Sequence, residues 1–499
     1  MKNRKLLFLM PVLLLSLLFW SCTNLDENPV SQVTPDNFFQ TEAELLAGVI
    51  PVYSSARLFG WSEALHLQEV TSDEIVVPTR GGDWDDGGDW RRLHLQTWTP
   101  ADGKVNQAWN ELYTGVARAN AVLENLQQTT SDSPLIPTFI AEVRFLRALF
   151  YWWLMDMFGN VPVVTAATTD PDNPPQQNTR QELFEFVVQE LTEAITDLED
   201  VAPTYGRATK GAGNALLATV YLNAEVYSGT ARWSECVQAC DAVINSGMYA
   251  LMPVFTDIFA LENEGPGNTE NIFVSANLAE GGVGFPRMMA TLHYAQLPQT
   301  PWNGFSVVAD FFNRYDPEDD RIGILLVGPQ VVLAGPNAGD PAFDRQGNQL
   351  SFTVDFPLIN ATESHGVRIL KWPVDPSQNG GDAGNDVAIF RYSHILLAKA
   401  EALFNMGNTG EALALVNQVR ARSFEPDKDL TTLTADLILD ERGFEFIWEG
   451  HRRTDLIRHG RFLEAWSLKD ASDGAHRNLF PIPQVQRDAN PNLNQNPGY

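Results

Sequence analysis

A glycine-rich segment in the first fifth of the chain, 79–90, contains four aspartates whose carboxylates could act together. They are Asp83, Asp85, Asp86 and Asp89. Carboxylate oxygens at this density are ligands that Ca²⁺ accepts, but no glutamate closes the loop at the twelfth position, as the EF-hand pattern requires. We therefore predict a solvated acidic turn and no cofactor, with a structural calcium ion as the alternative.

Two glutamates near the C-terminal end, Glu445 and Glu449, have the spacing of one helix face and could act as an acid/base pair. The catalytic carboxylates of glycoside hydrolases normally flank a cleft about 5–9 Å wide. This pair instead adjoins Arg442, Arg452 and Arg453, which favours an ion-pair network. The chain also lacks His-Glu-x-x-His, Walker A and Gly-x-Ser-x-Gly motifs, so no pattern in it is typical of an enzyme.

Two cysteines, Cys236 and Cys240, lie four residues apart in a segment with helical periodicity. On a helix this spacing puts both side chains on one face, an orientation that does not suit a disulfide between them. A zinc site would need further His or Cys ligands at suitable spacing, and none follows. We therefore predict two small buried hydrophobic side chains.

The elements that must position these residues are mostly helical, because apolar residues recur with helical period and Gly or Pro stands at the ends of the periodic stretches. The expected helices are 107–126, 139–158, 181–198, 213–227, 233–245, 391–405, 411–423 and 436–448. Two helical hairpins resemble each other, and the first, 214–247, has the period of about 34 residues that is typical of tetratricopeptide repeats. An ordinary helical hairpin is the alternative.

Between the two hairpins the chain is rich in Gly, Pro, Asn and Asp, with short apolar strands such as 271–275. Such a long irregular insertion is uncommon unless it carries function. We divide the chain into a leader, 1–21, and one fold, 22–499. Within that fold we expect an N-terminal region with helical hairpins, 22–247, a loop-rich insertion, 248–388, and a C-terminal repeat with its tail, 389–499.

The leader has a basic start followed by an apolar run, 6–20, that is short for a membrane span of about 20 residues. This pattern predicts a signal peptide. The run ends at Ser21-Cys22, where a bacterial lipoprotein would be cut and Cys22 lipidated. A buried or disulfide-bonded Cys22 is the alternative.

The charge of the chain excludes one class of partner. The formal net charge is −29, and no long basic run interrupts it. Nucleic-acid binding takes much of its affinity from Lys and Arg at phosphates, and anionic lipid surfaces make a similar demand. We therefore expect no nucleic-acid partner, and membrane attachment only through the lipid anchor.

Many ordered segments of the chain resemble those of SusD/RagB outer-membrane nutrient-binding lipoproteins of Bacteroidetes. The resemblance covers nearly all of the chain after the leader. The segments are Asn-Leu-Asp-Glu-Asn-Pro at 24–29, Thr-Pro-Asp-Asn-Phe-Phe at 34–39, Trp-Asn-Glu-Leu-Tyr at 109–113, Ala-Glu-Val-Arg-Phe-Leu-Arg-Ala at 141–148, Phe-Gly-Asn-Val-Pro at 158–162, Gly-Arg-Ala-Thr-Lys-Gly at 206–211, Leu-Asp-Glu-Arg-Gly-Phe-Glu-Phe at 439–446, Glu-Gly-His-Arg-Arg-Thr-Asp-Leu-Ile-Arg at 449–458, Phe-Pro-Ile-Pro at 480–483 and the C-terminal tail 490–499.

The resemblance implies a mainly α fold in which a tetratricopeptide-like helical scaffold carries a loop-rich face with short strands. It implies a lipid-anchored protein of the cell outer membrane, exposed at the surface. Such a protein binds oligosaccharide or polysaccharide without catalysis and works with a SusC-like TonB-dependent transporter. The alternatives are a surface-anchored glycoside hydrolase, or a helical-repeat adaptor of the transporter with no affinity for glycans.

The resemblance directs attention to tryptophans in loops, because sugar rings pack C–H faces on flat aromatics and present hydroxyls to polar side chains. Trp84 and Trp90 lie in the glycine-rich segment with Arg80 and Asp83. The long insertion supplies a second candidate group, which consists of Trp302, Asn303 and Tyr294. For each tryptophan the alternative is a structural anchor of its loop. The acidic charge of the chain favours a neutral glycan such as a β-glucan or fructan.

Overall fold

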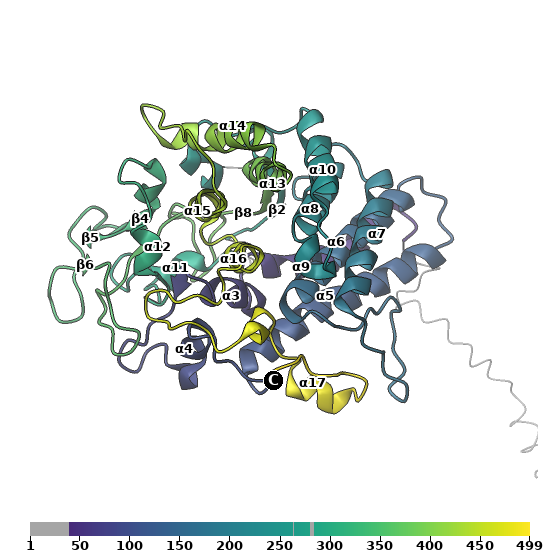
Figure 1. Ribbon diagram of the computed structural model, residues 1–499, viewed down its shortest axis with the longest axis horizontal. Helices are drawn as coiled ribbons and strands as arrows, with labels where there is room; N and C mark the ends of the chain where they lie inside the picture. Colours follow the sequence, from purple (N-terminus) through teal and green to yellow (C-terminus); the bar gives the residue numbers. More distant parts are fainter. Residues whose placement is uncertain (1–38, 263, 280–283) are drawn as a thin grey trace, which may run out of the picture.

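The computed structural model describes residues 39–262, 264–279 and 284–499. The predicted leader and Cys22 lie outside these residues. The fold is mainly α, as predicted: helices α5 to α10 occupy one side of the molecule and the short strands β4 to β6 the opposite side (Figure 1). No helix in the described ranges combines the length and the apolar character needed to cross a bilayer.

Three long helices form the centre of the helical side. They are α5 (Gly103–Gln128), α6 (Ile136–Phe158) and α7 (Arg180–Asp197), and α6 packs against both of the others. Nearly every residue of α6 from 141 onward is buried, as expected for a helix that is apolar on all sides. Helix α7 begins at Thr179, which forms a capping box with Glu182.

The two predicted hairpins are present and lie side by side. Helix α8 (Lys210–Leu222) packs on α10 (Trp233–Asn245), α10 packs on α13 (Tyr392–Asn405), and α13 packs on α14 (Thr409–Arg420). The expected helix 213–227 is interrupted at Asn223, after which the short α9 (Ala224–Ser228) follows. Cys236 and Cys240 are free and fully buried in α10, which confirms their predicted packing role.

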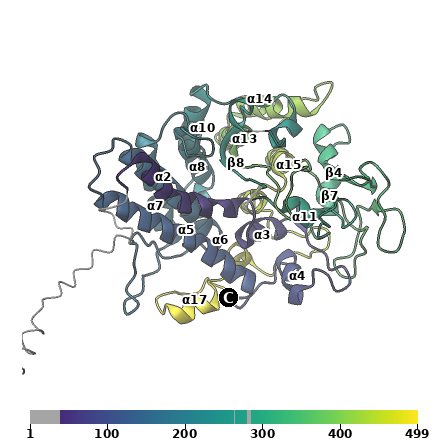
Figure 2. The ribbon, with the colours of Figure 1, turned by 180° about the vertical axis from the view of Figure 1, so that it is seen from behind.

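Several helices were not predicted from the sequence, mainly because they are short. Figure 2 shows one long exception, α2, beside α5 and α6. Its interior proline, Pro51, is unusual for a helix. The helices in this group are α2 (Glu42–Ala56), α3 (Glu63–Val70), α4 (Asp89–His94), α11 (Arg287–Thr291), α12 (Ala309–Phe312), α16 (Arg452–Arg458) and α17 (Gln484–Ala489).

The strands form four separate antiparallel pairs. The predicted strand β2 (Asn271–Ser275) is present and pairs with β8 (Val387–Arg391), which directly precedes α13. The other pairs are β1 (Ile75–Val76) with β3 (Ser306–Val307), β4 (Leu325–Leu326) with β7 (Arg368–Ile369), and β5 (Gly328–Pro329) with β6 (Ser351–Phe352).

The suspected acid/base pair belongs to a buried ion-pair network. Glu445 contacts Arg391 and Arg422, while Glu449 contacts Arg391 and Lys371, and both glutamates are buried. Burial opposes ionisation of Glu449, but Arg391 and Lys371 lower its pKa to about 2. An ion-pair network is therefore confirmed, but not its expected cations, because Arg442 pairs with Asp455, Arg452 with Asp73 and Arg453 with Asp156. The prediction that Glu445 and Glu449 share one helix face is wrong, because α15 (Ala435–Phe446) ends before Glu449.

Candidate functional site

A two-residue ladder brings together loops that are far apart in the sequence. Ile75 pairs with Val307 and Val76 pairs with Ser306, so the segment that follows β1 runs beside the segment that precedes β3. The first segment carries Trp84 and the second carries Trp302. The Trp84 indole nitrogen donates a 2.8 Å hydrogen bond to the Trp302 carbonyl oxygen. The structure thus unites two predicted candidates at one site.

The two indoles of this pair are held in different ways. The Trp84 ring lies against Gly304, where an added Cβ would be 2.4 Å from ring atom Cζ2. It also makes edge-to-face contact with Phe305, at 5.8 Å between centroids. The Trp302 side chain is 38% exposed, and its ring centroid lies 6.2 Å from that of Trp61. Both rings are therefore fixed while part of their surface stays accessible.

Trp90 is a structural anchor in this arrangement. Only 4% of it is exposed, and its indole nitrogen donates a 2.6 Å hydrogen bond to Asp86. The ammonium group of Lys104 lies 3.8 Å from the centroid of its ring, and the edges of His66 and Trp84 pack on it. No face of the ring is open to a sugar, so the structure does not support the predicted glycan contact at Trp90.

Arg80 and Asn303 also act within the protein. The Arg80 guanidinium is buried and donates to the carbonyl oxygens of Asn303 and Thr362, at 2.7 and 2.5 Å, and to Ser306 Oγ at 3.0 Å. Burial lowers the pKa of Arg80 to about 10. Asn303 is fully buried, and its Oδ1 accepts a 2.7 Å hydrogen bond from Arg368. These two residues hold the loops that carry Trp84 and Trp302. Because both are buried, the structure corrects the predicted direct contacts of Arg80 and Asn303 with glycan, and we assign them a positioning role.

A polar rim adjoins the tryptophan pair. The Tyr294 hydroxyl donates a 3.0 Å hydrogen bond to Asp83, so these two candidates also meet in the structure. The Arg345 guanidinium lies 4.6 Å from the centroid of the Tyr294 ring, 3.5 Å from Asp83, and in contact with Glu363. Burial and the nearby Asp83 carboxylate raise the pKa of Tyr294. The rim therefore offers hydroxyl, carboxylate and guanidinium groups beside two aromatic surfaces.

Arg345 comes from a hairpin that reasoning from sequence did not single out. Strands β5 and β6 pair with each other, and bridges between Val331 and Pro341 and between Phe343 and Gln349 extend the hairpin toward its tip. Trp61 was likewise missed, since it lies in a short segment before α3 that carries no repeat or motif. Its aromatic character in a segment without helical periodicity was the one available signal.

The four aspartates of the glycine-rich segment point to separate partners. Asp86 accepts from Trp90, Asp89 pairs with Arg92, and Asp85 lies 3.9 Å from Arg91. Asp83 belongs to the rim. Across the described ranges, no group of three or more His, Cys, Asp or Glu side chains is arranged to hold a metal ion.

Comparisons with known proteins agree with this architecture. A family model described as "Starch-binding associating with outer membrane" matches residues 25–222, and a second, described as "SusD family", matches residues 347–499. The starch-binding protein SusD of Bacteroides thetaiotaomicron is 26% identical over 494 residues, covering 87% of this chain and 85% of its own.

Solved structures show the same fold. A SusD-like protein from Bacteroides fragilis superposes with a TM-score of 0.77 at 22% identity, covering 93% of this chain and 98% of that one. Surface glycan-binding protein A from Bacteroides thetaiotaomicron, in complex with laminarihexaose, superposes with a TM-score of 0.73 at 23% identity, covering 91% and 99%. This chain belongs to the SusD/RagB family of SusD-like proteins.

Proposed function

We propose that this protein binds a glycan at the cell surface without catalysis and delivers it to a SusC-like TonB-dependent transporter. The observation that carries this proposal is the fixed pair of Trp84 and Trp302 beside the rim of Tyr294, Asp83 and Arg345. Indole rings supply flat apolar surface for the C–H faces of sugars, and the rim supplies donors and acceptors for hydroxyls. The site needs no reorganisation of the tryptophans to do this.

The glycan we propose is neutral, with a β-glucan or a fructan as the leading class. The rim holds one cation, Arg345, and two carboxylates, Asp83 and Glu363, a balance that disfavours an anionic sugar. Two relatives support carbohydrate as the ligand class, since one is named a starch-binding protein and another was solved with laminarihexaose.

The absence of catalysis is proposed from the state of the two rim carboxylates. A glycoside hydrolase needs a carboxylic acid that is protonated near neutral pH, opposite a second carboxylate. Burial opposes ionisation of Glu363, but hydrogen bonds from Arg345 and His293 hold its pKa below the usual value. Glu363 is therefore not suited to act as a general acid. Asp83 is bound to Tyr294 and Arg345.

The proposed location is the outer face of the outer membrane, with lipidated Cys22 as the anchor. The description of the family model that matches 25–222 includes association with the outer membrane, which supports this location. A lipid anchor would leave the acidic polypeptide free of the membrane surface, where its partner would be the transporter.

The test is native gel electrophoresis through gels cast with laminarin, starch, levan, xylan or alginate. We expect retardation by at least one neutral polysaccharide, none by alginate, and no sugar products after incubation with the retarding polysaccharide. Release of oligosaccharides would instead identify a hydrolase. Free migration in every gel, with co-purification of a SusC-like partner, would identify an adaptor that does not bind glycans.

A further inference from the structure

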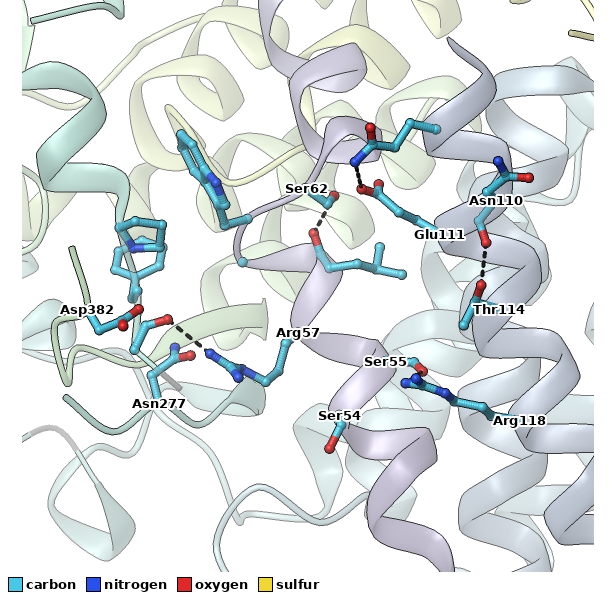
Figure 3. A pocket seen from close by; sticks show the side chains of 17 residues that line it. Ser54, Ser55, Arg57, Ser62, Asn110, Glu111, Thr114, Arg118, Asn277 and Asp382 are labelled. Carbon is cyan, nitrogen blue, oxygen red and sulfur yellow. Dashed lines mark hydrogen bonds between the residues drawn. The ribbon is translucent and has the colours of Figure 1, made fainter. Parts of the chain in front are cut away.

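A polar cavity lies where the helical scaffold meets the loop-rich side of the molecule. Its volume is about 540 Å³, which falls within the range of about 300–1,000 Å³ typical of small-molecule sites. Figure 3 shows Asn277 and Asp382 on one side of the cavity and side chains of α5 on the other, with residues of α2 and of the 3₁₀ turn that follows it between them.

This cavity lies next to Trp302 of the tryptophan pair, although Trp302 does not itself line it. Trp61 lines the cavity, and its ring centroid is 6.2 Å from that of Trp302. On the opposite side, Asp382 lines the cavity, and its neighbour Gly381 approaches Trp302 so closely that an added Cβ would lie 3.7 Å from ring atom Cζ2. Trp302 and the cavity therefore share two neighbours, so a glycan chain on Trp302 needs only to pass over Trp61 to reach the cavity.

Two arginines that line the cavity, Arg57 and Arg118, use only some of their hydrogen-bond donors within the described ranges. Arg57 donates through Nη2 to the Gly284 carbonyl oxygen at 3.0 Å, but its buried Nε has no hydrogen-bond partner within the described residues. Arg118 is held by Ser55 Oγ through Nη1, at 2.9 Å. The Nε atom is covered by protein, but Arg57 Nη1 makes no hydrogen bond in the part of the chain that the structure describes and is the donor that a bound hydroxyl could satisfy.

The charges that face this space are balanced. Arg57 and Arg118 stand against Asp382 and Glu111, and both carboxylate oxygens of Glu111 accept backbone N–H groups at the start of α3. A balanced set of donors and acceptors suits an uncharged ligand rich in hydroxyls better than an anion.

We propose that this cavity is a second subsite, which binds additional sugar residues of the same glycan chain that packs on Trp302. The inference rests on the proposed function, because it extends that binding site. It assigns Trp61 as the surface over which the chain passes, and Arg57 with Asp382 as the pair that recognises its hydroxyls.

The decisive variant is Ser54→Trp, which fills the cavity from its rim. Ser54 is an exposed residue of α2 that lines the cavity, and its side chain makes no hydrogen bond within the described part of the chain. Tryptophan and serine have similar helix propensities, so the helix should tolerate the change. Ser54→Ala is the matched control, since it removes the hydroxyl and leaves the space open.

The ligands are a trisaccharide and a hexasaccharide prepared from whichever of laminarin, starch, levan or xylan retards the wild-type protein. By calorimetry, Ser54→Trp should weaken hexasaccharide binding roughly tenfold or more, equivalent to about 1.4 kcal/mol, with trisaccharide binding unchanged. Ser54→Ala should bind both as the wild type does. Asp382→Asn should also weaken hexasaccharide binding, whereas Asp132→Asn, at an exposed aspartate that does not line the cavity, should not.

Two results would overturn the inference, and they are distinguishable. If Ser54→Trp and Asp382→Asn bind the hexasaccharide as tightly as the wild type while loss of Trp302 abolishes binding, the cavity is not a subsite although the proposed function stands. If none of the four polysaccharides retards the wild type, the proposed function fails and the subsite fails with it. Matching thermal unfolding of the variants and the wild type verifies that each variant is folded.

Discussion

The indole N–H of Trp84 donates a 2.8 Å hydrogen bond to the backbone carbonyl oxygen of Trp302, which lies 218 residues further along the chain. Because Trp302 accepts with its backbone, its indole ring is not used in this bond and can face a ligand, while the Trp84 ring is fixed by it. The Trp84 ring is therefore ordered before any ligand arrives, and packing against Trp61 limits the motion of the Trp302 ring, which lowers the entropy cost of binding.

Removing both indoles should abolish most glycan affinity without unfolding the protein. In the double variant Trp84→Ala, Trp302→Ala, we expect affinity to fall roughly 30-fold or more, because each stacked ring contributes about 0.5–1.5 kcal/mol beyond the area it buries. Isothermal titration with the retarding polysaccharide measures this loss. Trp302→Phe is the control and should keep most of the affinity. Unchanged binding by the double variant would reject this site.

Gly304 should be needed for the position of Trp84, although it touches no ligand itself. An alanine Cβ would lie 2.4 Å from the Trp84 ring and must displace it. We expect Gly304→Ala to lose affinity to an extent similar to Trp84→Ala. The matched control is Gly82→Ala, because an added Cβ there meets nothing within 4 Å. Equal affinities for the two alanine variants would show that the ring position is unimportant.

Arg80 should matter for stability more than for contact with the glycan. Lysine cannot replace a guanidinium that bonds Asn303, Thr362 and Ser306 together, so Arg80→Lys leaves buried acceptors unpaired. We expect the free energy of unfolding to fall by about 2–3 kcal/mol, measured by urea denaturation. The exposed Arg345 serves as control, since Arg345→Lys should leave the midpoint nearly unchanged. If Arg80→Lys loses affinity with an unchanged midpoint, Arg80 contacts the glycan.

His451 should make the protein less stable in mild acid. Burial, assisted by the nearby Arg442, lowers the pKa of His451 to about 4 from about 6.5 in the unfolded chain. Between these two values the unfolded state binds more protons, so stability is complete above pH 6.5 and falls as the pH drops toward 4. The difference corresponds to roughly 3 kcal/mol.

Urea denaturation of the wild type and of His451→Gln at several pH values should differ by this slope. Part of the slope should remain, because burial also lowers the pKa of His94 to about 4. A slope that His451→Gln leaves unchanged would contradict the prediction.

The long helices could be predicted from the sequence because their signal is local. The apolar residues of 139–158 and the helical periodicity of 181–198 are each contained within one element. Elements were missed where contacts with distant segments determine the secondary structure. Strand β8 forms because β2 pairs with it, and α2 retains an interior proline because it packs against α5 and α6.

The candidate site shows the same limit. Trp84, Trp302, Tyr294 and Asp83 could be chosen as aromatic and polar residues in loops, and they meet in the structure. Composition could not exclude Trp90 from the glycan-binding candidates, because burial of its ring depends on Lys104 and on other distant residues. Nor could it find Arg345, whose proximity depends on a hairpin far along the chain.

The strands of that hairpin pack on the rest of the site, since the Arg368 guanidinium lies over the Phe352 ring and the Leu333 N–H donates to the Gln296 carbonyl oxygen, but its tip is bonded within the hairpin. Its strands β5 and β6 bond to each other, whereas Trp84 and Trp302 are held by the β1–β3 ladder and Arg80. Substitutions or insertions near its tip can therefore change the rim without moving the aromatic pair. The framework that fixes the tryptophans can therefore stay the same while the residues of the hairpin tip, which contribute to the polar rim, vary with the ligand. Exchanging the hairpin tip is accordingly a way to redesign the specificity of the site.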